Sequence, residues 1–414
     1  MLARRYEQVR ALSRALVAPL SDADATAQSM ADASPAKWHL AHVTWFFETF
    51  VLRDHLPDYR LFEARWPFLF NSYYEAEGAR HARPQRGLLT RPTLEQVLAY
   101  RAFVDDALLA AMPLLAETCG ELIELGLHHE QQHQELLLTD IKHLFSCNPL
   151  GPAVWPPGDA AMAPGTAQDM PTVWHEGRTG LVEIGAAEDG FAFDNEQPVH
   201  RHFLTPHALA GQLVTNGEWR RFIEDGGYAT ASLWLSDGWA WVNRESVAHP
   251  LYWRRGDDDG WEQFTLAGWR PVDPRAPVTH ISAYEADAFA AWAGARLPTE
   301  QEWETFARNA DPLAGVQLDE AGPVAPRAVE PVDGLAPLFG NVWQWTGSAY
   351  RPYPGFRAAP GAVGEYNGKF MSGQFVLKGG SCATPRGHVR ATYRNFFYPH
   401  QRWQFTGLRL AKDL

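Results

Sequence analysis

The spacing of hydrophobic residues divides the chain into two parts with different patterns. Up to about residue 150, apolar positions recur every three to four residues over long stretches, as they do along one face of an α-helix. Four such stretches predict helices over residues 2–17, 34–56, 93–112 and 121–145. Only one connection, roughly residues 57–92, is long, and this arrangement predicts a four-helix bundle.

Helix start signals support two of these helices. Ser34 is expected to be an N-cap, with Pro35 at the first helical position, where a missing backbone N–H is tolerated. Thr93 and Gln96 have the spacing of a capping box, in which each side chain accepts a hydrogen bond from the backbone N–H of the other.

Beyond residue 150 the helical period disappears. Residues 151–171 are rich in Pro, Gly and Ala and are interpreted as a linker. From residue 172 short apolar segments alternate with Gly-rich turns, and two short helices are predicted behind capping boxes at Ser282 and Thr299. Most of the seventeen tryptophans lie in this part, which predicts an aromatic-rich domain with few long helices.

Composition narrows the class of protein. The 414 residues are enough for two cores, and 46% hydrophobic with 21% charged residues is ordinary for a globular enzyme. The formal net charge is −13 and no run of Lys or Arg occurs, so nucleic acid and anionic membrane are not expected partners. No signal-peptide core or membrane-spanning apolar run is present, and three cysteines give no disulfide framework. We therefore expect a soluble, cytoplasmic protein.

The candidate chemistry centres on the segment HHEQQHQE, residues 128–135. His129 and His133 are four residues apart, so on a helix they share a face and can hold one metal ion. The same H-E-x-x-H pattern occurs in zinc proteases, which need a third ligand further along the chain. Neither Gly nor His stands at the required places after His133, which argues against a protease. Two histidines at this spacing also occur on many helices that bind no metal.

A third ligand is available upstream, in the segment WHLAH. His39 and His42 are three residues apart on the predicted helix 34–56, so one or both can face the bundle interior. A buried histidine is more often a core residue, but a second His-rich helix favours a metal site between the two. Three imidazoles suit Fe(II), Zn(II) or Cu(II), and the ligand type does not choose among these ions.

Both halves resemble known families. The segments WHLAH and GLHHEQQHQELLLTD resemble the metal site of the DinB-like four-helix bundle. The segments VTNGEWRRFI, GNVWQWTGS and LKGGSCAT resemble the formylglycine-generating-enzyme (sulfatase-modifying-factor) domain, which has a C-type-lectin-like fold. Fused in this order over nearly the whole chain, they resemble the ergothioneine-biosynthesis sulfoxide synthases. The resemblance implies an α+β architecture, with the bundle over 1–150 and the lectin-like domain over 172–414.

The resemblance implies a nonheme iron enzyme. With O2 it would join a thiol sulfur to the imidazole C2 carbon of Nα-trimethylhistidine (hercynine) and leave the sulfur as a sulfoxide. Its implied Fe(II) ligands are His42, His129 and His133, and Glu130 would not be a protease base.

The same resemblance implies substrate contacts. Gln132 in the bundle, with Asn395 and Phe396 in the second domain, would contact the quaternary ammonium of hercynine, which suits aromatic faces and amide oxygens. Arg83 and Arg86 match a pair that holds the carboxylate of the thiol substrate. The alternatives are an aromatic core residue at position 396 and a solvated basic loop at the two arginines.

A tyrosine is implied as the proton or hydrogen donor. Tyr73 and Tyr74 lie where the branch of the family that uses free cysteine has its tyrosine. In the branch that uses γ-glutamylcysteine the tyrosine comes from the C-terminal domain, where Tyr366 is a weaker candidate. That second branch also has an Asp where this chain has Phe397, which follows Phe396 in the hercynine-binding segment and is also expected to bind substrate. Both departures favour cysteine as the thiol donor.

Four other functions stay open at this point. A formylglycine-generating oxidase needs a pair of cysteines for copper, whereas Cys382 stands alone after the GGS turn and is expected to be a small buried residue. A zinc-dependent DinB-like thiol S-transferase explains the histidines but not the second domain. A lectin-like binding module explains the second domain but not the histidines. Ovothiol-pathway synthases usually carry a further methyltransferase domain, for which the sequence has no counterpart.

Overall fold

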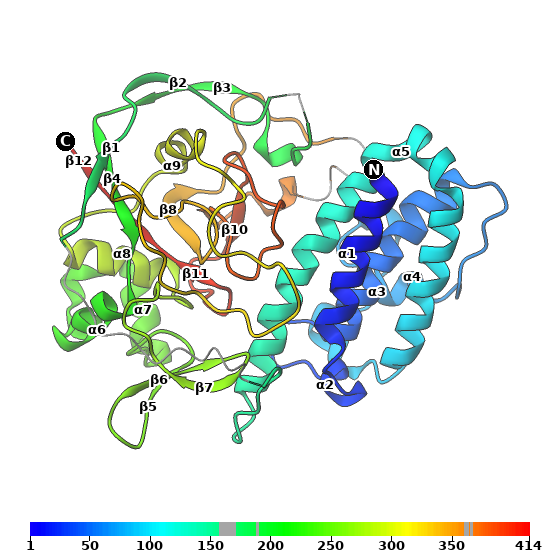
Figure 1. Cartoon of the computed structure of the whole chain (residues 1–414), viewed down its shortest axis with the longest axis horizontal. Helices are drawn as coiled ribbons and strands as arrows, with labels where there is room; N and C mark the ends of the chain where they lie inside the picture. The colour runs from blue at the N-terminus through cyan, green and yellow to red at the C-terminus, as the bar shows by residue number, and fades with distance from the viewer. Residues whose placement is uncertain (157–170, 188–189, 360–363, 365–366) are drawn as a thin grey trace. The chain divides into compact units, whose positions relative to one another are not determined.

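The computed structural model describes residues 1–156, 171–187, 190–359, 364 and 367–414, and the chain forms two compact units (Figure 1). The first unit consists mainly of Met1–Trp155, and the second contains most of the chain that follows. The predicted linker, residues 151–171, lies largely outside the described residues.

The first unit is a helical bundle, as predicted. Its elements in chain order are α1 (Leu2–Val17), α2 (Asp22–Thr26), α3 (Ala36–Phe46), the π-helix η1 (Phe47–Arg53), α4 (Trp66–Phe70), the 3₁₀ turns η2 (Glu75–Glu77) and η3 (Arg83–Leu88), and α5 (Leu94–Ser146).

The start of α3 corrects the predicted cap. Pro35 is the N-cap residue, with extended backbone angles, and the helix begins one residue later than predicted. Ser34 does not cap the helix, because its backbone N–H donates to Asp140 and its hydroxyl accepts from Arg86. Tertiary contacts thus use the groups that a cap would have used. The second half of the predicted helix is the π-helix η1, whose wider turn changes the direction of the side chains that follow.

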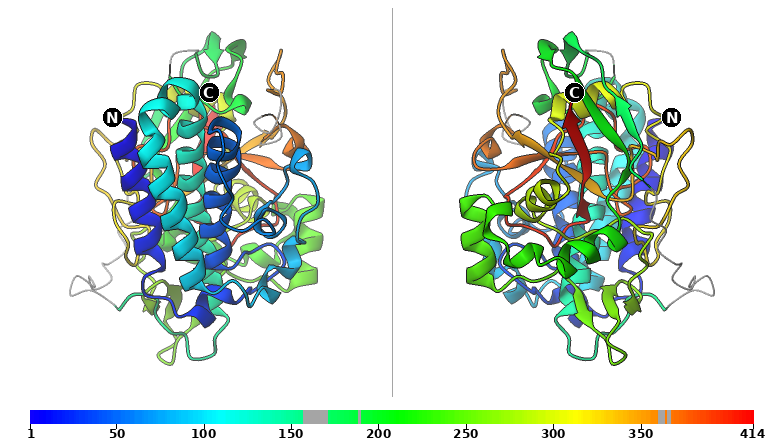
Figure 2. Two further views of the ribbon diagram at one scale, coloured as in Figure 1. Left: turned by 90° about the vertical axis from the view of Figure 1, so that its right-hand side faces the viewer. Right: turned by 90° about the vertical axis from the view of Figure 1, so that its left-hand side faces the viewer.

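The predicted helices 93–112 and 121–145 are the two arms of α5. Its capping box at Thr93 and Gln96 is confirmed. The backbone leaves helical geometry only at Cys119, with φ −146° and ψ 34°, and there the element turns back on itself (Figure 1). An ion pair of 2.7 Å between Arg101 and Glu130 joins the two arms. In the left-hand view of Figure 2 the helices of this unit run side by side.

The second unit is a mixed α/β domain built on short strands, as predicted. One antiparallel sheet has the order β1 (Trp174–Glu176), β4 (His207–Leu213), β12 (Arg409–Asp413). A second has the order β10 (Asn395–Phe397), β9 (Phe375–Lys378), β8 (Trp343–Ala349), β11 (Thr406–Gly407), in which β11 runs parallel to β8. The remaining sheets are β2 (Gly180–Ile184) with β3 (His200–Leu204), and β5 (Trp253–Arg255), β6 (Trp261–Thr265), β7 (Gly268–Pro271).

Short helices surround these sheets. They are α6 (Asn216–Glu224), α7 (Ser236–Glu245), α8 (Ala283–Trp292) and α9 (Glu300–Ala307), with the 3₁₀ turns η4 (Asp194–Glu196), η5 (Gly227–Ala229), η6 (Ala231–Leu233) and η8 (Gly368–Phe370). The capping boxes predicted at Ser282 and Thr299 are both confirmed. The core is aromatic, with Trp219, Trp303, Trp343 and Trp345 fully buried. Across the described residues, no helix has both the length and the apolar character needed to cross a membrane.

Candidate metal centre

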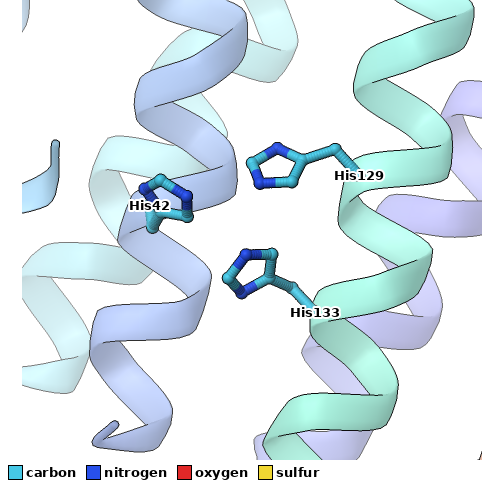
Figure 3. A group of neighbouring side chains, drawn as sticks. All are labelled: His42, His129 and His133. Carbon is cyan, nitrogen blue, oxygen red and sulfur yellow. The ribbon is translucent and has the colours of Figure 1, made fainter. Parts of the chain in front are cut away.

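Three histidines from two facing helices of the bundle converge on one point. His42 comes from α3, and His129 and His133 come from successive turns of α5 (Figure 3). One ring nitrogen of each lies within 4.8 Å of the others. The structure therefore brings together the three residues predicted to be metal ligands, at a separation suited to one ion.

The protonation of His42 fits a metal ligand. Its Nδ1–H donates to the carbonyl oxygen of Phe70 at 2.6 Å, because a carbonyl can only accept. The neutral ring therefore carries a lone pair on Nε2, and this buried atom has no hydrogen-bond partner among the described residues. Buried polar atoms are nearly always paired, so an unpaired acceptor beside two more imidazoles indicates a metal site.

Burial favours the neutral, metal-binding form of all three rings. It lowers the pKa of His42 and of His133 well below the ordinary histidine value, and the neighbouring His129 lowers both further. Burial also lowers the pKa of His129 to about 3. Since an imidazolium cannot ligate a metal, the cluster is held in the form that can.

Aromatic rings hold the cluster on the α3 side. The ring of His42 stacks with those of Trp38 and Trp45, with ring centroids 4.6 Å and 5.6 Å apart and interplanar angles of 13° and 16°. Phe46 packs against His129 at 5.0 Å. Such packing restricts the rotation of the ligand rings and keeps their donor atoms aimed at one point.

His39 lies beside the cluster and does not belong to it. Its Nδ1 is 2.8 Å from Nδ1 of His133, and its Nε2 is 3.0 Å from a carboxylate oxygen of Asp140. Asp140 was not predicted from the sequence. The signal was present, because Asp140 follows His133 by seven residues, which is two helical turns on the same face of α5.

Glu130 contradicts the protease interpretation of HEQQH. Its side chain is fully buried and accepts hydrogen bonds from Arg10 at 2.8 Å, Arg101 at 2.7 Å and Ser13 at 2.6 Å. Burial alone would raise its pKa, but the two guanidinium groups lower it to about 2. A carboxylate held in this way is too weak a base to activate a metal-bound water.

The two arginines predicted to bind substrate have different environments. Arg86 is 3% exposed, lies 3.3 Å from the ring centroid of Trp38, and donates to the hydroxyls of Ser34 and Ser72. No carboxylate pairs with it in the described part of the chain, and its buried Nε has no partner there. Burial, together with the charge of Arg83, lowers the pKa of Arg86 to about 8. An uncompensated buried guanidinium of this kind favours an anionic ligand.

Arg83 is exposed and donates to the backbone carbonyl of Asp32. The alternative of a solvated basic loop therefore describes Arg83 but not Arg86.

The two predicted tyrosines lie in the aromatic shell of the cluster. Tyr74 is buried, and its ring packs against those of Trp45 and Phe50, with centroid separations of 5.5 Å and 5.2 Å. Tyr73 stacks on Tyr74 at 4.9 Å and is half-buried. Tyr74 is thus linked to His42 through the ring of Trp45, and Tyr73 is linked to it through the rings of Tyr74 and Trp45. The weaker candidate Tyr366 lies outside the described residues.

The residues predicted to bind hercynine come from both units. Gln132 is half-buried on α5, one turn from His129 on the same side of the helix. Asn395, Phe396 and Phe397 form strand β10 of the second unit. Phe396 stacks on Tyr350 at 4.2 Å, and Phe397 meets Trp403 edge-on at 6.2 Å. Contact of these four residues with a substrate stays a prediction.

Comparison with known proteins finds relatives that match along the whole chain. Residues 5–137 match the DinB superfamily, and residues 166–323 and 330–414 match the Sulfatase-modifying factor enzyme 1-like domain. Hercynine oxygenase of Mycobacterium tuberculosis is 33% identical over an alignment that covers 100% of this chain and 99% of that protein. This chain belongs to the hercynine oxygenase family. As a member of it, the protein is an oxidoreductase.

Two further relatives support the assignment. Hercynine oxygenase of Mycolicibacterium thermoresistibile is 33% identical, covering 92% of this chain and 88% of that protein. The formylglycine-generating enzyme of Thermomonospora curvata is 27% identical over an alignment that covers 56% of this chain and 91% of that enzyme. The rival oxidase therefore matches only about half of a chain that hercynine oxygenases match throughout. Within the described part of the chain Cys382 is buried, as predicted, and forms no disulfide bond.

Proposed function

We propose that this hercynine oxygenase family member is a sulfoxide synthase of ergothioneine biosynthesis that depends on Fe(II) and O2. It joins a thiol sulfur to the imidazole C2 of hercynine. One oxygen atom ends on the sulfur, and the other leaves as water with the hydrogens of C2 and of the thiol. The observation that carries the proposal is the cluster of three converging histidines in a chain that matches hercynine oxygenases over its full length.

His42, His129 and His133 would hold the metal. Bound Fe(II) would supply the reactivity towards O2 that no amino-acid side chain possesses. The ligand set also suits zinc, and membership of the hercynine oxygenase family supports iron.

Arg86 is proposed to bind the carboxylate of the thiol substrate. Its guanidinium lies on one face of Trp38, and the ring of His42 stacks with the same indole at 4.6 Å. A carboxylate held by Arg86 would therefore sit close enough to the cluster for a small thiol amino acid to reach it. Arg83, exposed on the same turn, would contribute a weaker contact at the rim.

Tyr73 and Tyr74 are proposed as the proton or hydrogen donors that direct the reaction to the carbon–sulfur bond instead of to a sulfinate. Gln132, Asn395, Phe396 and Phe397 are proposed to bind hercynine. The tyrosine pair beside the cluster and Phe397 in place of an Asp support cysteine over γ-glutamylcysteine.

The proposal predicts a specific product. The protein is reconstituted anaerobically with Fe(II) and then given hercynine, equal amounts of cysteine and γ-glutamylcysteine, and air, with mass spectrometry of the products. We expect mainly hercynyl-cysteine sulfoxide. A γ-glutamyl adduct would keep the synthase and overturn the choice of thiol. Tight zinc binding with no adduct would instead favour the zinc-dependent S-transferase or a binding module without catalysis.

The role of Arg86 predicts a selective loss of thiol affinity. Arg86→Gln removes a charge-assisted contact worth about 1.5–3 kcal/mol, so the KM for the thiol should rise about 10- to 100-fold while the KM for hercynine changes little. The matched control is Arg91→Gln, an exposed arginine of the same connection. Steady-state kinetics with each substrate varied in turn would decide. Equal rises in both KM values would show that Arg86 supports the fold and not the thiol.

A further inference from the structure

We infer that His39 and Asp140 form a positioning pair that holds His133 in the tautomer able to bind a metal. The inference rests on the metal site proposed above, and it concerns two residues to which no role has been given. His39 lies one turn before His42 on α3, and Asp140 lies two turns after His133 on α5. The pair therefore links the same two helices that carry the ligands.

The direction of each hydrogen bond follows from Asp140. One carboxylate oxygen of Asp140 accepts the backbone N–H of Ser34 at 2.8 Å and lies 3.0 Å from Nε2 of His39. An ionised carboxylate can only accept, so the proton of His39 is on Nε2. With one proton on its ring, His39 then presents Nδ1 as an acceptor.

The acceptor Nδ1 of His39 determines which ring nitrogen of His133 carries the proton. The two Nδ1 atoms of His39 and His133 are 2.8 Å apart, and a hydrogen bond at this distance needs one proton between them. Since His39 has its proton on Nε2, His133 must donate from Nδ1. Its Nε2 is then the lone-pair atom. The opposite tautomer of His133 would place two lone pairs face to face inside the protein.

The rings of His133 and His42 thus have the same hydrogen-bonding arrangement. In each ring Nδ1–H donates to an acceptor of the protein, which is the carbonyl oxygen of Phe70 for His42 and the imidazole of His39 for His133. In each ring Nε2 is left as the donor atom for a metal. An acceptor behind a ligating histidine fixes its orientation and raises its basicity, and its removal typically costs about 10- to 100-fold in metal affinity.

The pair is protected from water and connected to the proposed thiol site. Ser34, His39 and Asp140 are all at least 94% buried, so water does not readily replace a lost partner. The hydroxyl of Ser34 accepts from Nη1 of Arg86 at 2.9 Å, while its backbone N–H donates to Asp140. One hydrogen-bonded path therefore runs from Arg86 to His133.

The test measures tautomers and metal affinity in the full-length protein and does not depend on turnover. Two-bond ¹H–¹⁵N spectra of the metal-free wild-type protein should show His133 protonated on Nδ1 and His39 protonated on Nε2. Co(II) titration should show His39→Leu binding about 10- to 100-fold more weakly than wild type, with a changed d–d spectrum. His39→Gln should recover part of that affinity, because its amide oxygen can still accept from His133. The control His143→Gln lies on the same helix outside the path and should bind like wild type.

Two results would overturn the inference. One is wild-type His133 protonated on Nε2, and the other is His39→Leu with wild-type Co(II) affinity and spectrum. If His39→Leu does not fold, the wild-type tautomers and His39→Gln still decide the question. Wild-type protein that binds Co(II) through the predicted tautomers but forms no sulfoxide would keep the positioning pair and refute the proposed function.

Discussion

His129→Ala is expected to lose its metal and to form the sulfoxide product at well under one hundredth of the wild-type rate. His129 is fully buried, and its ring packs edge-on against both His42 and His133. Alanine leaves two of the three imidazoles of the cluster. Loss of an outer partner of a ligating histidine already costs up to about 100-fold, and loss of the ligand itself should cost more. Metal content after Fe(II) reconstitution and product yield by mass spectrometry would measure both effects.

The control for this prediction is an exposed histidine of the same unit. His55→Ala alters a side chain near the end of η1, away from the cluster, and should retain metal and activity. His42→Ala should match His129→Ala, and the double variant should be no worse than either, because residues that act as a unit show non-additive losses. Full metal content and turnover in His129→Ala would refute the three-histidine site.

The periodic parts of the chain were predictable from the sequence because they depend on neighbours in the chain. The span of α1, the capping box before α5 and the shared face of His129 and His133 all follow from spacings of three or four residues. The same logic allowed one or both histidines of WHLAH to face inwards, and in the structure both are buried.

The remaining features depend on contacts between distant segments. The displaced cap at Pro35 arises because Ser34 is engaged by Asp140 and Arg86, which lie 106 and 52 positions away in the chain. The reversal at Cys119 lies in the gap between the predicted helices 93–112 and 121–145, directly before Gly120, but the spacing of apolar residues does not fix the residue at which the chain turns. The role of His39 also needs the pairing of α3 with α5. Such contacts have no short-range pattern, so only the structure assigns them.

The same contrast applies to the substrate residues. From the sequence, Arg83 and Arg86 are equivalent members of one basic loop. In the structure Arg86 is buried on the indole of Trp38, whereas Arg83 reaches the surface. Burial makes Arg86 the stronger candidate for binding an anion, because only the buried guanidinium lacks the solvation that water gives. For Phe396 the structure adds a stack on Tyr350, which suits both an aromatic core and a binding face.

Glu130→Gln is expected to destabilise the bundle by about 3–5 kcal/mol, the usual loss when one partner of a buried ion pair is removed. Glu130 holds Arg10 of α1 and Arg101 of the first arm of α5, and both guanidinium groups are almost completely buried. Glutamine has nearly the same shape, so the loss reports the charge and not a cavity. Arg10 keeps Asp105 at 2.7 Å, whereas the partners that remain for Arg101 among the described residues are all neutral. Denaturant unfolding of the metal-free protein would measure the change.

Glu124→Gln is the matched control, because it breaks an ion pair between Glu124 and Arg5 in which both side chains are more than a third exposed. Such pairs contribute at most about 1 kcal/mol. Similar losses in the two variants would contradict the importance of the buried network.

The pH dependence of the free energy of unfolding gives a second check of the contribution of Glu130 to stability. The pKa of Glu130 is lowered to about 2 in the folded protein from an ordinary value of 4.5. A carboxyl whose pKa is lower when folded stabilises the protein above pH 4.5, and this contribution disappears as the pH falls towards 2. The difference corresponds to about 3 kcal/mol, which agrees with the loss expected for Glu130→Gln. Glu130→Gln should therefore lose less stability than wild type between pH 4.5 and 2. An unchanged acid profile would mean that other carboxylates, and not Glu130, hold α1 against α5 in acid.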